Sequence, residues 1–189
     1  MKIQIIIGSV RPGRVGPQVA KWIAENLPEP ADTEYEVVDI ASWNLPFLDE
    51  PGLPSQGNYK QDHTIEWSNK IKEADGFVFL TPEYNAGYAP ALKNAIDYLY
   101  AEWTNKPVMV ASYGVGGGTT ASAQLYQVAE RLKMRITETS PAISIAGSVR
   151  EDNGQIKDAD IFFGSYMPVI KAAGKELLDL VQAPEEAKV

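Results

Sequence analysis

The sequence contains no cysteine and a single histidine, His63. Without cysteine the chain has no disulfide, no thiolate nucleophile, no cysteine-based zinc site and no thiolate-bound iron–sulfur cluster. One histidine is also a poor supply for a catalytic metal, because such sites usually draw on several imidazoles. A serine hydrolase is disfavoured as well, since the sequence has no Gly-x-Ser-x-Gly motif. We therefore expect no metal site.

Long apolar runs and excess basic charge are also missing. No apolar run approaches the roughly 20 residues that span a bilayer, and the first residues lack the layout of a signal peptide. The 25 acidic residues outnumber the 17 basic ones, giving a net charge of −8. This disfavours general nucleic-acid binding, which needs a broad basic surface. We expect a cytoplasmic protein with no membrane or nucleic-acid partner, in which any anion is bound locally.

Short apolar runs alternate with amphipathic helical patterns. Strands are expected at Lys2–Ile7, Tyr35–Ile40, Gly76–Leu80, Pro107–Ser112 and Ala142–Ala146, and helices at about 17–27, 65–74, 92–103, 121–132 and 158–181. The fold class predicted by this alternation is α/β, with helices on both faces of a parallel sheet. We expect a flavodoxin-like three-layer α/β/α arrangement, with five strands in the order 2-1-3-4-5. Residues 1–182 are expected to form one domain, followed by a polar tail at 183–189.

A glycine-rich turn, residues 8–17, links the first strand to the first helix. Such a turn collects free amides at the positive end of the helix dipole, which favours an anion. Ser9 supplies a hydroxyl, and Arg11 and Arg14 supply charge and forked donors. The turn lacks both the Walker Gly-Lys-Ser/Thr and the GxGxxG fingerprint, so a monophosphate is the better match. The alternative is a surface turn with solvated arginines.

Two further loops follow the third and fourth strands, at 81–94 and 113–120. In the first, Glu83, Tyr84 and Asn85 are expected to present amides to a flat, polar-edged ring, with Tyr84 as an aromatic surface. In the second, clustered glycines favour close backbone approach. Both loops are also compatible with ordinary turns. Carboxyl ends of parallel strands share one edge, so we expect these loops to meet the residue 8–17 turn there.

The segment from 43 to 60 carries too many prolines and glycines for regular structure. A loop this long in a compact domain is more often functional or disordered than neutral, so we expect it to form a wall or lid of a substrate pocket. His63 lies just beyond it and ahead of a helical stretch. A capping or surface role is favoured for this residue, because its pattern indicates no catalytic one.

Three motifs in order resemble the NADPH-dependent FMN reductase family, which includes small quinone, azo-compound and chromate reductases. They are GSxRxxR at Gly8–Arg14, TPEYN with LKNAID at Thr81–Asn85 and Leu92–Asp97, and KPV…SYG…GG within Lys106–Gly118. The resemblance implies non-covalently bound FMN, NADPH or NADH as cosubstrate, and a homodimer or homotetramer. The FMN-binding residues that it implies are Ser9, Arg11, Arg14, Gly16, Pro17, Pro82, Glu83, Tyr84, Asn85, Ser112, Tyr113, Gly114 and Gly116.

The function expected on these grounds is an FMN-dependent NAD(P)H oxidoreductase that passes hydride to a small acceptor, such as a quinone, free flavin, azo compound or metal oxyanion. No catalytic side chain is expected, because the cofactor performs the difficult chemistry. The alternative is an FMN-binding electron carrier or redox-responsive interaction protein whose acidic surface docks on basic partners. The sequence does not distinguish NADPH from NADH, and it does not identify the acceptor.

Overall fold

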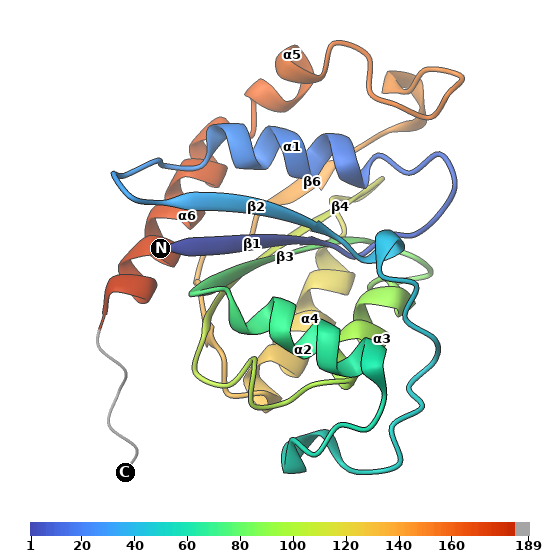
Figure 1. The fold of residues 1–189 in the computed structure, drawn as a ribbon. Helices are drawn as coiled ribbons and strands as arrows, with labels where there is room; N and C mark the ends of the chain where they lie inside the picture. The colour runs from blue at the N-terminus through green and yellow to red at the C-terminus, as the bar shows by residue number, and fades with distance from the viewer. Residues whose placement is uncertain (184–189) are drawn as a thin grey trace.

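The computed structural model describes residues 1–183, apart from the side chain of Ser148. A parallel sheet in the order β2-β1-β3-β4-β5 lies between two layers of helices (Figure 1). Its strands are β1 (Lys2–Ile7), β2 (Glu34–Asp39), β3 (Gly76–Pro82), β4 (Pro107–Gly114), β5 (Arg135–Ile136) and β6 (Ala142–Ser144). The three layers and the strand order confirm the predicted fold class. Of the tail expected at 183–189, all but Ala183 lies outside the described residues.

The helices divide between the two faces of the sheet (Figure 1). They are α1 (Gly16–Asn26), α2 (Asp62–Lys72), α3 (Pro90–Asp97), α4 (Thr119–Arg131), α5 (Ala159–Gly164) and α6 (Met167–Gln182). Ile23 of α1 and Leu177 of α6 belong to the core on one face. Trp67, Leu92 and Leu125, from α2, α3 and α4, belong to the core on the other. No helix within residues 1–183 is long and apolar enough to cross a bilayer.

The predicted fifth strand is present as β6, with one further short strand before it. Expected at Ala142–Ala146, it is preceded in the structure by a second short strand, β5, and both β5 and β6 pair in parallel with β4. Between them the Thr137 hydroxyl donates to the main-chain oxygen of Thr139 at 3.0 Å. Pro141, which has no N–H, precedes β6. The sheet is therefore six-stranded.

Two helix boundaries also differ from prediction. The second helix begins at Asp62, three residues earlier than expected, and the third ends at Asp97 instead of continuing to Trp103. Trp103 is fully buried, and its indole N–H donates to the main-chain oxygen of Ile96 at 3.1 Å. Tyr98 is also buried. Two aromatic side chains of the segment after α3 therefore fill the core.

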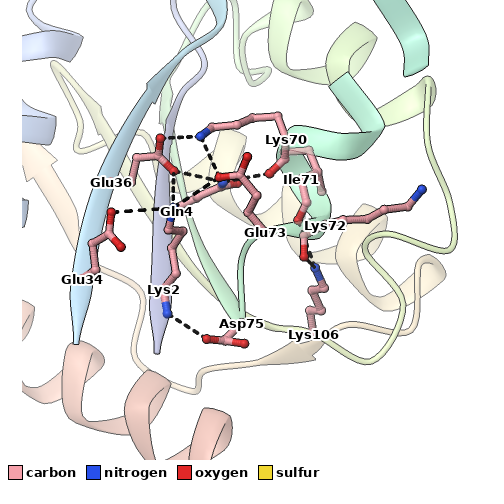
Figure 2. A network of polar contacts seen from close by, with 10 residues as sticks. All are labelled: Lys2, Gln4, Glu34, Glu36, Lys70, Ile71, Lys72, Glu73, Asp75 and Lys106. Atoms are coloured by element: carbon pink, nitrogen blue, oxygen red, sulfur yellow. Dashed lines mark hydrogen bonds and ion pairs between the residues drawn. The ribbon is translucent and has the colours of Figure 1, made fainter. Parts of the chain in front are cut away.

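A network of charged side chains lies at the amino ends of the strands (Figure 2). Lys2 on β1 lies 3.3 Å from the Glu73 carboxylate, and Lys70 on α2 bonds both Glu73 and Glu36. Lys106 donates to a main-chain oxygen at the end of α2 at 3.0 Å. Exposed ion pairs contribute little each, so this network mainly orders the edge of the sheet. The candidate ligand loops follow the strands at the opposite edge.

Candidate functional site

The turn between β1 and α1 and the loops after β3 and β4 meet at one cavity of about 200 Å³. Larger hollows occur elsewhere, but here the three predicted loops come together. The lining residues are Ser9, Arg11, Pro12, Gly13, Arg14, Val15, Pro82, Glu83, Tyr84, Tyr113, Gly114, Val115, Ile145 and Arg150. The predicted convergence at the carboxyl edge of the sheet is therefore present.

Ser9 and Tyr84 join the first two loops directly. Their hydroxyl oxygens lie 2.6 Å apart, which is a short hydrogen bond. The guanidinium carbon of Arg11 lies 5.5 Å from the centre of the Tyr84 ring, within the range of a cation–π contact. The Tyr84 ring thus has a hydroxyl partner at one end and a positive charge over its face.

Arg14 makes a contact that the sequence did not predict. Its guanidinium donates two hydrogen bonds to the Asp39 carboxylate, at 2.7 and 2.5 Å, and a third to the main-chain oxygen of Ser9 at 2.5 Å. Burial alone would raise the pKa of Asp39, but the hydrogen bonds from Arg14 and from the Ala41 amide outweigh it and lower that pKa. The hydrogen bond with Asp39 in turn raises the pKa of Arg14. The charge of Arg14 is therefore already compensated, and the side chain fixes the turn.

Sequence analysis did not identify Asp39 as a partner of Arg14, because the two residues are distant in the chain and are brought together only by the fold. Asp39 ends β2, and β2 pairs in parallel with β1, so that Asp39 lies beside Ile7. A parallel pairing of the first two strands carries the last residue of β2 to the turn that follows β1. The one feature of the sequence that could have identified Asp39 is its place as an acidic residue at the end of the second strand.

Tyr113 places a buried hydroxyl beside the turn between β1 and α1. The residue is 3% exposed, and its hydroxyl has no hydrogen-bond partner among the described residues. The pKa of Tyr113 is raised chiefly by burial. A side chain at Gly16 would come within 3.0 Å of this hydroxyl and 2.9 Å of Ile7, so Gly16 is required by packing. A buried donor without a partner costs about 1–3 kcal/mol, which makes a ligand atom a natural partner.

The loop after β3 uses two of the amides expected to face a ring. The Tyr84 amide donates to the Gly87 oxygen at 2.8 Å, and the Glu83 amide donates to an oxygen of β4 at 3.0 Å. Asn85 and Ala86 form the tip of this tight turn, with φ values of 49° and 62°. The Glu83 and Tyr84 amides are thus directed within the protein, which corrects the sequence-based expectation for them.

The Glu83 carboxylate has a further role in holding two loops together. It accepts hydrogen bonds from the amides of Thr120 and Ala121 in the first turn of α4, at 3.1 and 3.2 Å. An acidic side chain at this position also complements the helix dipole. Glu83 lines the cavity, but its charge is directed to α4.

The loop after β4 is held by Ser112. The Ser112 hydroxyl donates to the Gly117 oxygen at 2.9 Å, and the residue itself is fully buried. Gly118 is required here because its φ is +77° and a side chain would come within 3.0 Å of both Ser112 and the Tyr113 amide. At Gly116, by contrast, a side chain would meet no protein atom within 4 Å. Packing within the protein therefore does not require glycine at position 116.

Eight of the predicted site residues line the cavity. Those that do not line it are Gly16, Pro17, Asn85, Ser112 and Gly116. Pro17 lies in the first turn of α1, where its missing N–H costs little. Sequence reasoning missed Ile145 and Arg150, which reach the cavity from the segment after β6. No local pattern marks Arg150, since only the fold brings it to the turn.

The 43–60 loop lies against a neighbouring cavity of about 610 Å³, which its residues 44–47 line together with Val10 and the start of α3. The loop is fastened by Asn94, which donates to the Pro46 oxygen at 2.6 Å, and by Asp49, which lies 2.9 Å from the His63 ring. His63 is in the first turn of α2, and it does not line the cavity formed by the three loops. The predicted structural role of His63 fits this position.

Comparison with known proteins identifies the family to which the chain is similar. A family model described as NADPH-dependent FMN reductase matches residues 1–148. A Schizosaccharomyces pombe protein named NAD(P)H-dependent FMN reductase C4B3.06c is 43% identical over 190 residues, covering 99% of this chain and 94% of that protein. An Escherichia coli quinone reductase is 31% identical over 138 residues, covering 67% and 69%. FerB from Paracoccus denitrificans, described as a flavoenzyme NAD(P)H:(acceptor) oxidoreductase, superposes with a TM-score of 0.72 at 19% identity, covering 94% of this chain and 97% of FerB.

Proposed function

The chain belongs to the NADPH-dependent FMN reductase family and is an FMN-dependent NAD(P)H oxidoreductase, and we propose that it holds FMN in the cavity between its three loops. The observation that carries this proposal is the direct contact of Ser9 with Tyr84, which joins the phosphate-type turn to the loop after β3. In a fold with this strand order, ligands bind at that edge of the sheet.

The residues present fit FMN. The flavin phosphate is matched by the turn at the amino end of α1 and by Arg11, whose guanidinium lies over Tyr84. The unpartnered Tyr113 hydroxyl offers a buried donor within the same cavity. Gly116 leaves open space beside the loop after β4, as the close approach of a ring would require.

The chemistry that bound FMN supplies is hydride transfer between NADPH or NADH and a small acceptor. The residues of this chain bind and orient it. Arg11 supplies positive charge to the phosphate, and Tyr84 supplies an aromatic surface held by its bond to Ser9. Arg14 keeps the turn in shape through Asp39. No side chain of the cavity is assigned a catalytic role.

The acceptor that we propose is a small molecule of the quinone type. The quinone reductase relatives support this substrate class. The neighbouring 610 Å³ cavity supports it further, because it is lined largely by apolar residues such as Ile40, Leu45 and Phe47. Phe47 is 90% exposed beside this cavity, and in this proposal the 43–60 loop forms the wall predicted from the sequence.

We also propose that the chain forms a homodimer or homotetramer. A groove of about 660 Å³ between α3 and α4 supports this, since Ile96, Leu99, Tyr100 and Val128 line it. Light scattering on the purified protein measures the assembly, and Tyr100→Glu is expected to shift it toward the monomer. The cytoplasmic location expected from the sequence stays a prediction.

The visible spectrum of the purified protein, supplied with FMN and then dialysed, tests the proposal. Retained absorbance near the flavin bands is expected, followed by rapid bleaching when NADPH or NADH is mixed in under anaerobic conditions. A protein that retains no flavin contradicts the FMN site. Bleaching only after a separate reductase is added would favour the electron carrier.

A further inference from the structure

The segment after β6 folds back onto the turn between β1 and α1. Arg150 and Ile156 pair as an antiparallel bridge, which closes a short hairpin. Gln18 on α1 holds this hairpin by bonding both main-chain polar groups of Ile156, donating to the Ile156 oxygen at 2.9 Å and accepting from the Ile156 amide at 2.8 Å. Ile156 itself is 3% exposed. The hairpin is therefore fixed in place, and it lies beyond the residues that the family model matches.

The hairpin also packs directly against the turn at Gly13. Gly154 has a φ of +84°, and a side chain there would lie 2.6 Å from the Gly13 oxygen. The side-chain amide of Gln155 donates to the main-chain oxygen of Arg14 at 3.3 Å. These contacts bring Arg150 to the wall of the cavity, beside the turn predicted to bind phosphate.

The arginines that are free to bind an anion at this cavity are not the pair expected from the sequence, Arg11 and Arg14. Arg14 lines it, but two hydrogen bonds to Asp39 compensate its charge. Within residues 1–183, neither Arg11 nor Arg150 has a carboxylate within ion-pair distance. Glu83, the acidic residue that lines the cavity, accepts hydrogen bonds from the start of α4. Arg11 and Arg150 are thus the two arginines of the cavity lining whose guanidiniums make no ion pair within the described residues.

We propose that Arg150 is a phosphate-binding residue of the flavin site. Arg11 and Arg150 together bind the phosphate, and Arg150 thus has the role that the sequence predicts for Arg14. This inference rests on the proposed FMN site. A phosphate placed between the two guanidiniums would accept forked, charge-assisted hydrogen bonds from both. A hairpin outside the three loop motifs thus contributes a phosphate-binding side chain to the site.

Titration of the flavin-free protein with FMN and with riboflavin, followed by flavin fluorescence, tests this role. Riboflavin carries the same ring without the phosphate, so a phosphate contact affects FMN alone. For Arg150→Gln we expect FMN binding to weaken by about tenfold or more, as loss of a charge-assisted hydrogen bond predicts, with riboflavin binding unchanged. Arg150→Lys is expected to retain part of the FMN affinity, and the salt dependence of FMN binding is expected to be shallower in Arg150→Gln.

Lys157→Gln is the matched control. It removes one positive charge from the same segment, but Lys157 does not line this cavity. The inference is overturned if Arg150→Gln binds FMN no more weakly than Lys157→Gln does. An equal loss of FMN and riboflavin binding would also overturn it, because the side chain would then act on the ring or on the loop. Failure of the unaltered protein to bind either flavin would overturn the FMN site itself, and the role of Arg150 with it.

Discussion

The hydroxyl oxygens of Ser9 and Tyr84 lie 2.6 Å apart, although the two residues are 75 positions apart in the chain. Ser9 follows β1 and Tyr84 follows β3, and these strands are neighbours in the sheet. The contact therefore ties together two loops that the sheet brings to one edge. If FMN binds there, this hydrogen bond sets the shape of the site before the flavin arrives.

Ser9→Ala and Tyr84→Phe are expected to destabilise the protein by amounts that do not add. The hydrogen bond is partly buried, so we expect a coupling energy of about 0.5–1.5 kcal/mol in the free energy of unfolding by urea. Tyr88→Phe serves as the control partner, since the Ser9 hydroxyl is bonded to Tyr84 and not to Tyr88. Additive effects of Ser9→Ala and Tyr84→Phe would argue against the contact.

Arg11→Ala is expected to weaken FMN binding by about 1–3 kcal/mol, as loss of a charge-assisted hydrogen bond to phosphate predicts. Riboflavin binding should change less, because the phosphate is absent. Calorimetry with each flavin measures both quantities. Arg131→Ala, on α4 and outside this cavity, makes the same change of charge and should leave both affinities as they are. An unchanged FMN affinity in Arg11→Ala would contradict the assigned role.

Asp39→Asn is expected to cost about 1 kcal/mol of stability at pH 6, a modest value because the Asp39 side chain is 31% exposed. The pKa of Asp39 in the folded protein lies below its ordinary value of 3.8. Its stabilising contribution is therefore present above that value and is lost as the pH falls through the lowered pKa.

The difference in unfolding free energy between the unaltered protein and Asp39→Asn should accordingly shrink as the pH falls from 6 to 3. Other carboxylates with lowered pKa values, such as Glu73, are common to both proteins and cancel in the comparison. Urea titrations at each pH provide the measurement. A difference that persists undiminished at pH 3 would show that the Arg14–Asp39 pair is not its source.

Ala86→Gly is expected to stabilise the fold by roughly 0.5–1 kcal/mol. Ala86 has a φ of 62°, a left-handed conformation that costs a residue with a side chain about 1–2 kcal/mol. Glycine removes that strain, and its greater freedom in the unfolded chain offsets part of the gain. Ala172→Gly, at an exposed position in the interior of α6, should have the opposite sign, since glycine disfavours a helix interior. Thermal melting of both variants measures these effects. A melting temperature that shifts in the opposite direction in either variant would contradict the prediction for it.

The strand order and the meeting of the three loops could be predicted because each rests on a local pattern. β1, β3 and β4 are buried along nearly their whole length and read as continuous apolar runs. In a parallel sheet the loops after such strands share an edge, so a contact like that of Ser9 with Tyr84 follows from the order of the strands alone.

What could not be predicted depends on contacts between distant segments. Arg14 appeared free in the sequence, and only the pairing of β2 with β1 brings Asp39 to it. Arg150 is positioned by Gln18, which lies far away in the chain. After the early end of α3 the chain returns to the helix, where the Trp103 indole donates to the Ile96 oxygen. Propensity and periodicity carry no information about such partners.

The absence of cysteine has a practical consequence at the cavity. Val115 lines it and is 81% exposed, so a Val115→Cys variant would carry the one thiol of the whole sequence at the mouth of the site. A thiol-reactive fluorophore attached there would label each chain once. Its emission would then report flavin arrival and departure in real time, independently of turnover.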